Sequence, residues 1–359
     1  MQIHGGNIAE ISRKYNLKAE TIIDFSSNIN PLGCPSNVQT FLQKVGNSIT
    51  AYPDPDSTEL RKEIAKRIDS DTKTILVGNG STELIYLIPR VIKPKCALIF
   101  SPTFGEYERS LLPMKCGVKF FPLKEKDNFK PNIDKITGLL PKIDILYLCN
   151  PNNPTGSLLE YSDIKSLLAE AEKRGVLVVV DESFMEFTDK ESIVVEIKKR
   201  KNLIVLKSLT KIYGIPGLRL GYLAANSKIV DIIKHHKEPW TVNTLAQKAG
   251  VACLNDEEFI LKTKRFITRE KKYLAGELNK INGLKPCDSS TNYILIKLVK
   301  SGLTSGGVYE TMAKQGLLIR DCRSFRGLGS KYIRIAVRKR KENNLLIKKL
   351  KSDVLVKSL

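Results

Sequence analysis

The sequence lacks long apolar runs, a signal segment and any spacing of cysteines or histidines that suits a metal. Its longest apolar stretches are short, such as 176–180, whereas a membrane span needs roughly 20 residues. Residues 1–10 contain no basic stretch followed by an apolar one, so no secretory signal is expected. The seven cysteines are widely spaced without a CxxC, and His235 is directly followed by His236. We therefore expect a cytoplasmic protein with reduced thiols, no membrane partner and no metal.

Acidic residues are in deficit, because 59 lysines and arginines face 38 aspartates and glutamates for a formal charge of +21. A nucleic-acid partner must be considered for such a chain. The lysines are scattered, however, and the densest basic run, 338–341, has no interleaved aromatic residues. A DNA-binding regulator would also need an added helix-turn-helix, and there is no room for one before His4 or after Leu359. We expect a solvated basic surface and no nucleic-acid partner.

Short apolar segments alternate with amphipathic ones from about residue 74 to 225. This pattern predicts an α/β fold with a mostly parallel sheet covered by helices on both faces. The expected strands are 74–77, 96–100, 143–148, 176–180, 203–206 and 218–223. The rest predicts a smaller α+β domain, with helices over 241–280 and near 308–315, strands at 293–298, 317–319 and 332–337, and a final helix. We predict an N-terminal arm packing with the small domain (1–45), a large domain (46–240) and a C-terminal small domain (241–359).

Glycine and hydroxyl residues follow the first expected strand, as Gly80, Ser81 and Thr82. At a helix start these residues can cradle a phosphate with backbone N–H groups, although for this segment taken alone a plain helix cap is the more common explanation. Phe104 follows the next strand and can stack on a flat ring, although a lone phenylalanine more often packs in the core.

Three more strand ends carry polar residues that can form one site. Asn153, Asp181 and Lys211 are 28 and 30 residues apart, and a βαβ unit takes roughly 30 residues, so all three should lie on one edge of the sheet. An acid that follows five apolar residues needs a cationic partner if it is buried. A half-buried lysine has a lowered pKa and can act as a Schiff-base nucleophile. The ordinary alternatives are turn residues, a helix cap and a surface lysine.

A phosphate cradle, a stacking ring, a buried acid and a buried lysine together suit pyridoxal 5'-phosphate (PLP). Asp181 would keep the ring nitrogen protonated, so that the ring accepts electrons. Ser208 lies just before Lys211 and Arg219 shortly after it. Both would join the loop at 80–82 around the cofactor phosphate. The sequence therefore predicts a PLP enzyme with Lys211 and Asp181 as catalytic residues.

The segments GNGSTE, NPNNPTG, DESF and SLTKIYGIPGLRLGY resemble those of the fold type I, class I/II aminotransferase family. The resemblance covers most of the chain and implies that Lys211 carries PLP as a Schiff base. It also implies a homodimer, because Tyr52 matches a tyrosine that reaches the neighbouring subunit's cofactor phosphate.

Within this family the chain resembles threonine-phosphate decarboxylases of cobalamin biosynthesis most, and histidinol-phosphate aminotransferases next. The first resemblance rests on HGGN at 4–7 and DFSSNINPLG at 24–33. It implies a small phosphorylated amino acid as substrate, bound by His4, Gly5, Asn28, Asn153, Arg320 and Arg334. Phe184 stands where aminotransferases usually carry a tyrosine, which points the same way. Transamination of histidinol phosphate and decarboxylation of serine phosphate remain alternatives.

Overall fold

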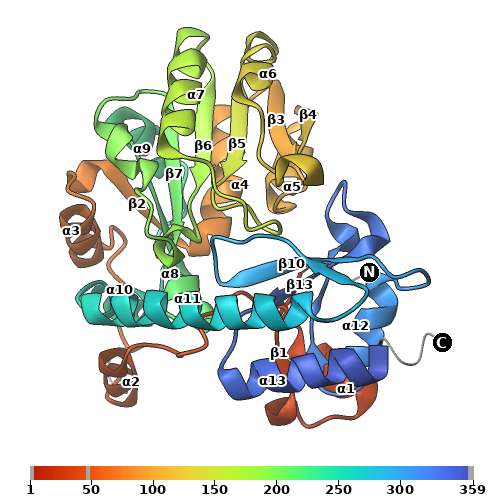
Figure 1. The fold of residues 1–359 in the computed structure, drawn as a ribbon. Coiled ribbons are helices and arrows are strands. Elements are labelled where there is room, and N and C mark those ends of the chain that lie inside the picture. The colour runs from red at the N-terminus through yellow and green to blue at the C-terminus, as the bar shows by residue number, and fades with distance from the viewer. Residues whose placement is uncertain (1–3, 46–48, 355–359) are drawn as a thin grey trace.

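A seven-stranded mixed sheet forms the larger part of the molecule in a computed structural model that describes residues 4–45 and 49–354 (Figure 1). Its strand order is β2-β8-β7-β6-β5-β3-β4. The strands are β2 (Ile75–Asn79), β3 (Cys96–Ser101), β4 (Gly117–Pro122), β5 (Ile145–Cys149), β6 (Leu177–Asp181), β7 (Leu203–Ser208) and β8 (Leu220–Ala225). All six predicted strands are confirmed, and β4 is an additional edge strand.

Strand β8 runs antiparallel to both of its neighbours, whereas the pairs from β7 to β4 are parallel. The sheet is therefore mostly parallel, as expected, with one reversed strand. The reversal arises because β7 and β8 are joined by a short connection through helix α8 (Leu209–Ile212), too short for the crossover that a parallel pair requires. It sets the start of β8 beside the end of β2, with Leu220 opposite Asn79.

Both faces of this sheet are buried, which explains the continuous apolar strands. In β6, Val178 and Val180 belong to the core on one face and Val179 to the core on the other. The first face is covered by α3 (Thr58–Arg67), α6 (Ile133–Thr137) and α7 (Tyr161–Lys173). The second is covered by α4 (Gly80–Ile92), α5 (Glu106–Leu111) and α9 (Ser227–Lys234).

A second, antiparallel sheet lies below the first (Figure 1), with the order β12-β13-β10-β9. Its strands are β9 (Leu284–Pro286), β10 (Tyr293–Leu298), β12 (Arg320–Asp321) and β13 (Tyr332–Ala336). The predicted C-terminal helices are α10 (Thr244–Leu254), α11 (Glu257–Asn279), α12 (Ser305–Ala313) and α13 (Arg340–Lys349).

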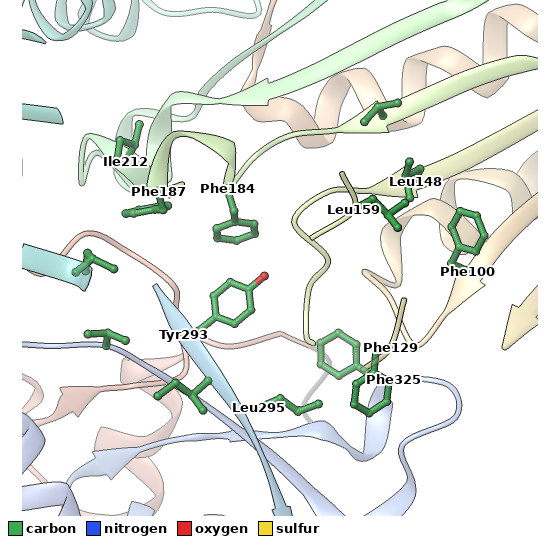
Figure 2. Close-up of a cluster of buried hydrophobic side chains, with 14 of the residues drawn as sticks. Phe100, Phe129, Leu148, Leu159, Phe184, Phe187, Ile212, Tyr293, Leu295 and Phe325 are labelled. Carbon is green, nitrogen blue, oxygen red and sulfur yellow. The ribbon is translucent and has the colours of Figure 1, made fainter. Parts of the chain in front are cut away.

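The N-terminal segment contacts this second part of the molecule. It contains α1 (Ile8–Tyr15), β1 (Ile23–Asp24) and α2 (Ser36–Gln43), and β1 pairs in parallel with β11 (Leu317–Leu318). The domain boundaries at 45 and 240 remain a prediction, because the hydrophobic core is continuous between the two sheets. Figure 2 shows this continuity where Phe184 meets Tyr293 of β10, with ring centroids 5.1 Å apart.

No helix within residues 4–45 and 49–354 is long and apolar enough to cross a membrane. The same residues contain no group of three or more histidine, cysteine or acidic side chains arranged to hold a metal ion.

Candidate active site

A cavity of about 660 Å³ opens between the carboxyl ends of the parallel strands and the second sheet. Thirteen of the fifteen predicted site residues line it, and they come from the N-terminal segment, the large sheet and the second sheet. They are His4, Gly5, Asn28, Ser81, Thr82, Phe104, Asn153, Asp181, Ser208, Lys211, Arg219, Arg320 and Arg334. Gly80 is not among the lining residues but lies against Arg219, which is one of them, and Tyr52 does not line the cavity.

Lys211 lies in α8, just after the carboxyl end of β7, and its side chain lines the cavity. Burial lowers the pKa of its amine to about 8, and the charges of Arg219 and Arg334 act in the same direction. The carboxylate of Asp181 opposes them. No described residue forms a hydrogen bond or an ion pair with Nζ, so the amine is available to a ligand in the cavity.

Asp181 ends β6 and is buried. Its Oδ2 accepts a hydrogen bond from the Tyr107 hydroxyl at 2.7 Å, and its Oδ1 accepts one from the Ser183 amide at 2.9 Å. No described side chain forms an ion pair with Asp181, so a bound ligand can supply the cation expected beside it. Sequence reasoning missed Tyr107, whose position on α5, three residues after Phe104, was its only signal.

A phosphate-sized cradle forms where α4 begins beside the loop that follows α8. Gly80 has φ +76°, and a Cβ atom there would lie 2.5 Å from Nη2 of Arg219. Arg219 itself has φ +57° and directly precedes the reversed strand β8, which is why it returns to the end of β2. The hydroxyl oxygens of Ser208 and Thr210 are 2.8 Å apart. A guanidinium, hydroxyls and a helix N-terminus thus line one cavity, and such groups suit an anion.

Two buried arginines face the cavity from the second sheet. Arg320 on β12 is directly opposite Arg334 on β13. Burial lowers the pKa of Arg320 to about 10, with the charge of Arg334 as the next cause. Arg334 donates hydrogen bonds to Oδ1 of Asn153 and to the Ser26 carbonyl, and its Nε is buried without a partner. Two adjacent buried cations favour an anionic ligand.

The N-terminal segment forms the remaining wall. Asn28 is buried, and its Oδ1 has no hydrogen-bond partner. The His4 ring lies 6.0 Å from the Phe104 ring between centroids, and His4 Nε2 lies 3.0 Å from a carboxylate oxygen of Glu106. Glu106 is a second residue that the motifs did not reveal. It is buried although it is acidic, a property that sequence alone does not show.

Tyr52 does not line the cavity of its own chain. Its side chain is 81% exposed, and its ring lies 4.9 Å from that of Trp240, which is also exposed. Together these rings form an aromatic pair on the outside of the chain.

Comparison with known proteins agrees with the family resemblance found in the sequence, along nearly the whole chain. The family model described as aminotransferase class I and II matches residues 20–350. The threonine-phosphate decarboxylase of Salmonella typhimurium is 33% identical over 97% of this chain and 96% of its own. The structure of L-threonine-O-3-phosphate decarboxylase from Porphyromonas gingivalis aligns with a TM-score of 0.83 at 33% identity, over 92% of this chain and 98% of that one. The histidinol-phosphate aminotransferase from Clostridium acetobutylicum aligns with a TM-score of 0.85 at 31% identity, over 91% and 97%.

Proposed function

This chain belongs to the class I and II aminotransferase family, and from that premise we propose that it is a PLP-dependent threonine-phosphate decarboxylase. The reaction would convert L-threonine O-3-phosphate to (R)-1-aminopropan-2-ol O-2-phosphate and CO₂, a step of cobalamin biosynthesis. The observation that carries the proposal is a single cavity in which the reactive amine of Lys211 faces the paired arginines Arg320 and Arg334.

The residues present fit PLP. The cradle of Gly80, Ser81, Thr82, Ser208 and Arg219 suits its phosphate, and the space that a Cβ at Gly80 would fill is taken by the Arg219 guanidinium. Asp181 supplies the carboxylate for the ring nitrogen, Phe104 a stacking face and Asn153 an amide at the ring edge. Lys211 would hold the cofactor covalently through Nζ. When bound, PLP supplies an electron sink for the bonding pair released at the substrate Cα.

The protein's own residues then divide the remaining tasks. Arg320 and Arg334 bind the substrate's phosphate and carboxylate and so orient its Cα, with His4, Gly5 and Asn28 closing the pocket. Asp181 holds a proton at the cofactor's ring nitrogen, and Tyr107 and Ser183 fix the carboxylate for this task. Lys211 Nζ would be the group that holds a proton beside the substrate Cα and returns it to that carbon once CO₂ has left. Such proton transfers contribute on the order of 10²–10⁴ in rate.

Transamination of histidinol phosphate is the alternative, favoured by the similarity to the Clostridium enzyme. Phe184 favours decarboxylation, because it lines the cavity without the hydroxyl that aminotransferases usually present there. Serine phosphate differs from threonine phosphate by one methyl group, and a methylene-sized difference is worth only about 1–3 kcal/mol in a pocket. It is therefore expected to be a slower substrate.

Product analysis separates these possibilities. Purified protein with PLP and threonine phosphate, without any keto acid, should release CO₂ and aminopropanol phosphate in equal amounts, measured by mass spectrometry. The Lys211→Ala variant is the matched control and should release neither. Amino transfer to 2-oxoglutarate from histidinol phosphate, without CO₂ release from threonine phosphate, would establish the alternative.

The proposal includes a cytoplasmic homodimer. The seven cysteines are free thiols, as in proteins of a reducing compartment. The exposed pair of Tyr52 and Trp240 supports a contact with a second subunit, since large exposed aromatics are typical of interfaces. No nucleic-acid or membrane partner is proposed.

A further inference from the structure

Glu106 is a buried carboxylate at the edge of the cavity with three side chains around it. Its oxygens lie 3.0 Å from Nε2 of His4, 2.6 Å from the hydroxyl of Tyr86 and 3.1 Å from Nη1 of Arg109. The hydrogen bond from His4 is the largest influence on its pKa. Burial opposes this influence, but the bond from Tyr86 and the charge of Arg109 add to it, and the pKa of Glu106 falls to about 2.

An ionised carboxylate only accepts hydrogen bonds, so the proton between Glu106 and His4 must be on Nε2 of the imidazole. No described residue bonds the other ring nitrogen, Nδ1. His4 itself lines the cavity beside Phe104. Nδ1 is therefore the ring nitrogen left for a ligand.

The chain around His4 is fixed from the other side as well. The Gly6 amide donates to the Ser26 hydroxyl at 2.8 Å, and that hydroxyl donates to Oδ1 of Asp24 at 2.6 Å. A Cβ at Gly5 would collide with the Ser26 backbone. Residues 4–6 thus cross from the segment at the end of β1 to α5, and Glu106 is their anchor on the α5 side.

We propose that Glu106 is a positioning residue that anchors His4 at the cavity wall with the proton on Nε2, so that Nδ1 meets the anionic end of the substrate. Nδ1 without a proton and a fully ionised anion both only accept, so the contact contains one proton, which the substrate brings as the monoprotonated form of its phosphate or which the ring takes up from solvent. The identity of the substrate rests on the proposed function. The arrangement of Glu106 and His4 does not, because it belongs to the free protein.

Nitrogen-15 NMR of histidine-labelled protein tests the arrangement directly. The chain has three histidines. Nδ1 of His235 and of His236 lie 2.6 and 3.0 Å from backbone carbonyl oxygens, which accept only, so these two rings carry the proton on Nδ1. At a pH where imidazoles are neutral, one ring should be fixed with the proton on Nε2, and His4→Gln should remove its signal. A His4 ring with the proton on Nδ1, or averaged between both nitrogens, would overturn the proposal.

Substitutions at position 106 give the second readout. Glu106→Leu removes the acceptor, so the His4 tautomers should average and KM for threonine phosphate should rise about tenfold, with kcat within about threefold, the pattern of lost substrate binding. Glu106→Gln keeps an acceptor oxygen, so the His4 tautomer should stay fixed and KM should be close to that of the parent protein. Glu172→Gln, which alters a half-exposed partner of Arg200 outside the cavity, is the control and should match the parent.

The two hypotheses fail differently. If Glu106→Leu does not fold, His4→Ala alone should reproduce the rise in KM, and an unchanged KM in His4→Ala overturns the proposal. Decarboxylation with a freely averaging His4 contradicts this inference only. A fixed tautomer without decarboxylation contradicts the proposed function and leaves the anchoring by Glu106 supported.

Discussion

The amine of Lys211 shows how a common residue becomes reactive through its surroundings. A lysine is nucleophilic only without its proton, so a lowered pKa moves its reactivity to lower pH. We predict that acylation of Lys211 in cofactor-free protein has a pH midpoint near 8, where burial and then Arg219 and Arg334 place its pKa. Peptide mass spectrometry after brief labelling measures this. Exposed lysines as a class should show an acylation midpoint at a pH of about 10.4, and the same midpoint at Lys211 would contradict the prediction.

Asp181 provides a charge whose removal need not disturb its contacts. Asp181→Asn retains an oxygen for Tyr107 or Ser183, so the fold should persist, while the ring nitrogen of the cofactor loses its counter-charge. We predict a fall in kcat of about 10²–10³, the range typical of a lost electrostatic stabiliser. Circular dichroism checks that the fold persists, and steady-state kinetics measures the fall in kcat. Tyr107→Phe, which removes one bond to the carboxylate, should have the smaller effect, and equal effects would argue against this role for the charge.

At the scale of elements, the junction of β2 and α4 depends on a glycine. At Gly80 a side chain meets both an unfavourable φ of +76° and the Arg219 guanidinium. We predict that Gly80→Ala costs about 1–2 kcal/mol of stability and weakens PLP binding tenfold or more. Gly175→Ala is a matched control, because Gly175 has φ +67° with nothing within 4 Å of a Cβ. It should show a similar loss of stability with unchanged PLP affinity, measured by fluorescence titration.

The strands of the large sheet were largely predictable because a strand buried on both faces is a continuous run of apolar residues. The direction of β8 was not predicted, since an apolar run carries no sign of strand direction and only the short connection from β7 could have indicated it. Strand β4 was missed because it is an edge strand of alternating burial that ends at Pro122. In the site, regular βα spacing brought Asn153, Asp181 and Lys211 together. His4, Asn28, Arg320 and Arg334 arrive through long-range packing, so only the resemblance placed them.

At the scale of the whole molecule, Tyr52 lies outside the cavity of its own chain and is exposed beside Trp240. If it serves the partner's cavity, mixing Tyr52→Ala with Lys211→Ala should create dimers in which one cavity carries neither substitution. We predict that such mixtures, refolded together, recover activity that neither variant shows alone, up to a quarter of the sites by random pairing. Sedimentation velocity should show a dimer throughout. Activity that stays at the sum of the separate variants would mean that Tyr52 does not cross to the second subunit.

The hydrogen bond from Arg334 to the Ser26 carbonyl joins residues 308 positions apart. On the ribosome, the nascent chain therefore exposes its lysine at 211 long before the strand that supplies Arg334 has been synthesised. One of the charges that depress the pKa of that amine is missing until then, together with the wall that would hold a substrate. A nascent chain that ends before β13 should consequently leave this lysine less reactive, so that the chemistry begins only once synthesis is nearly over.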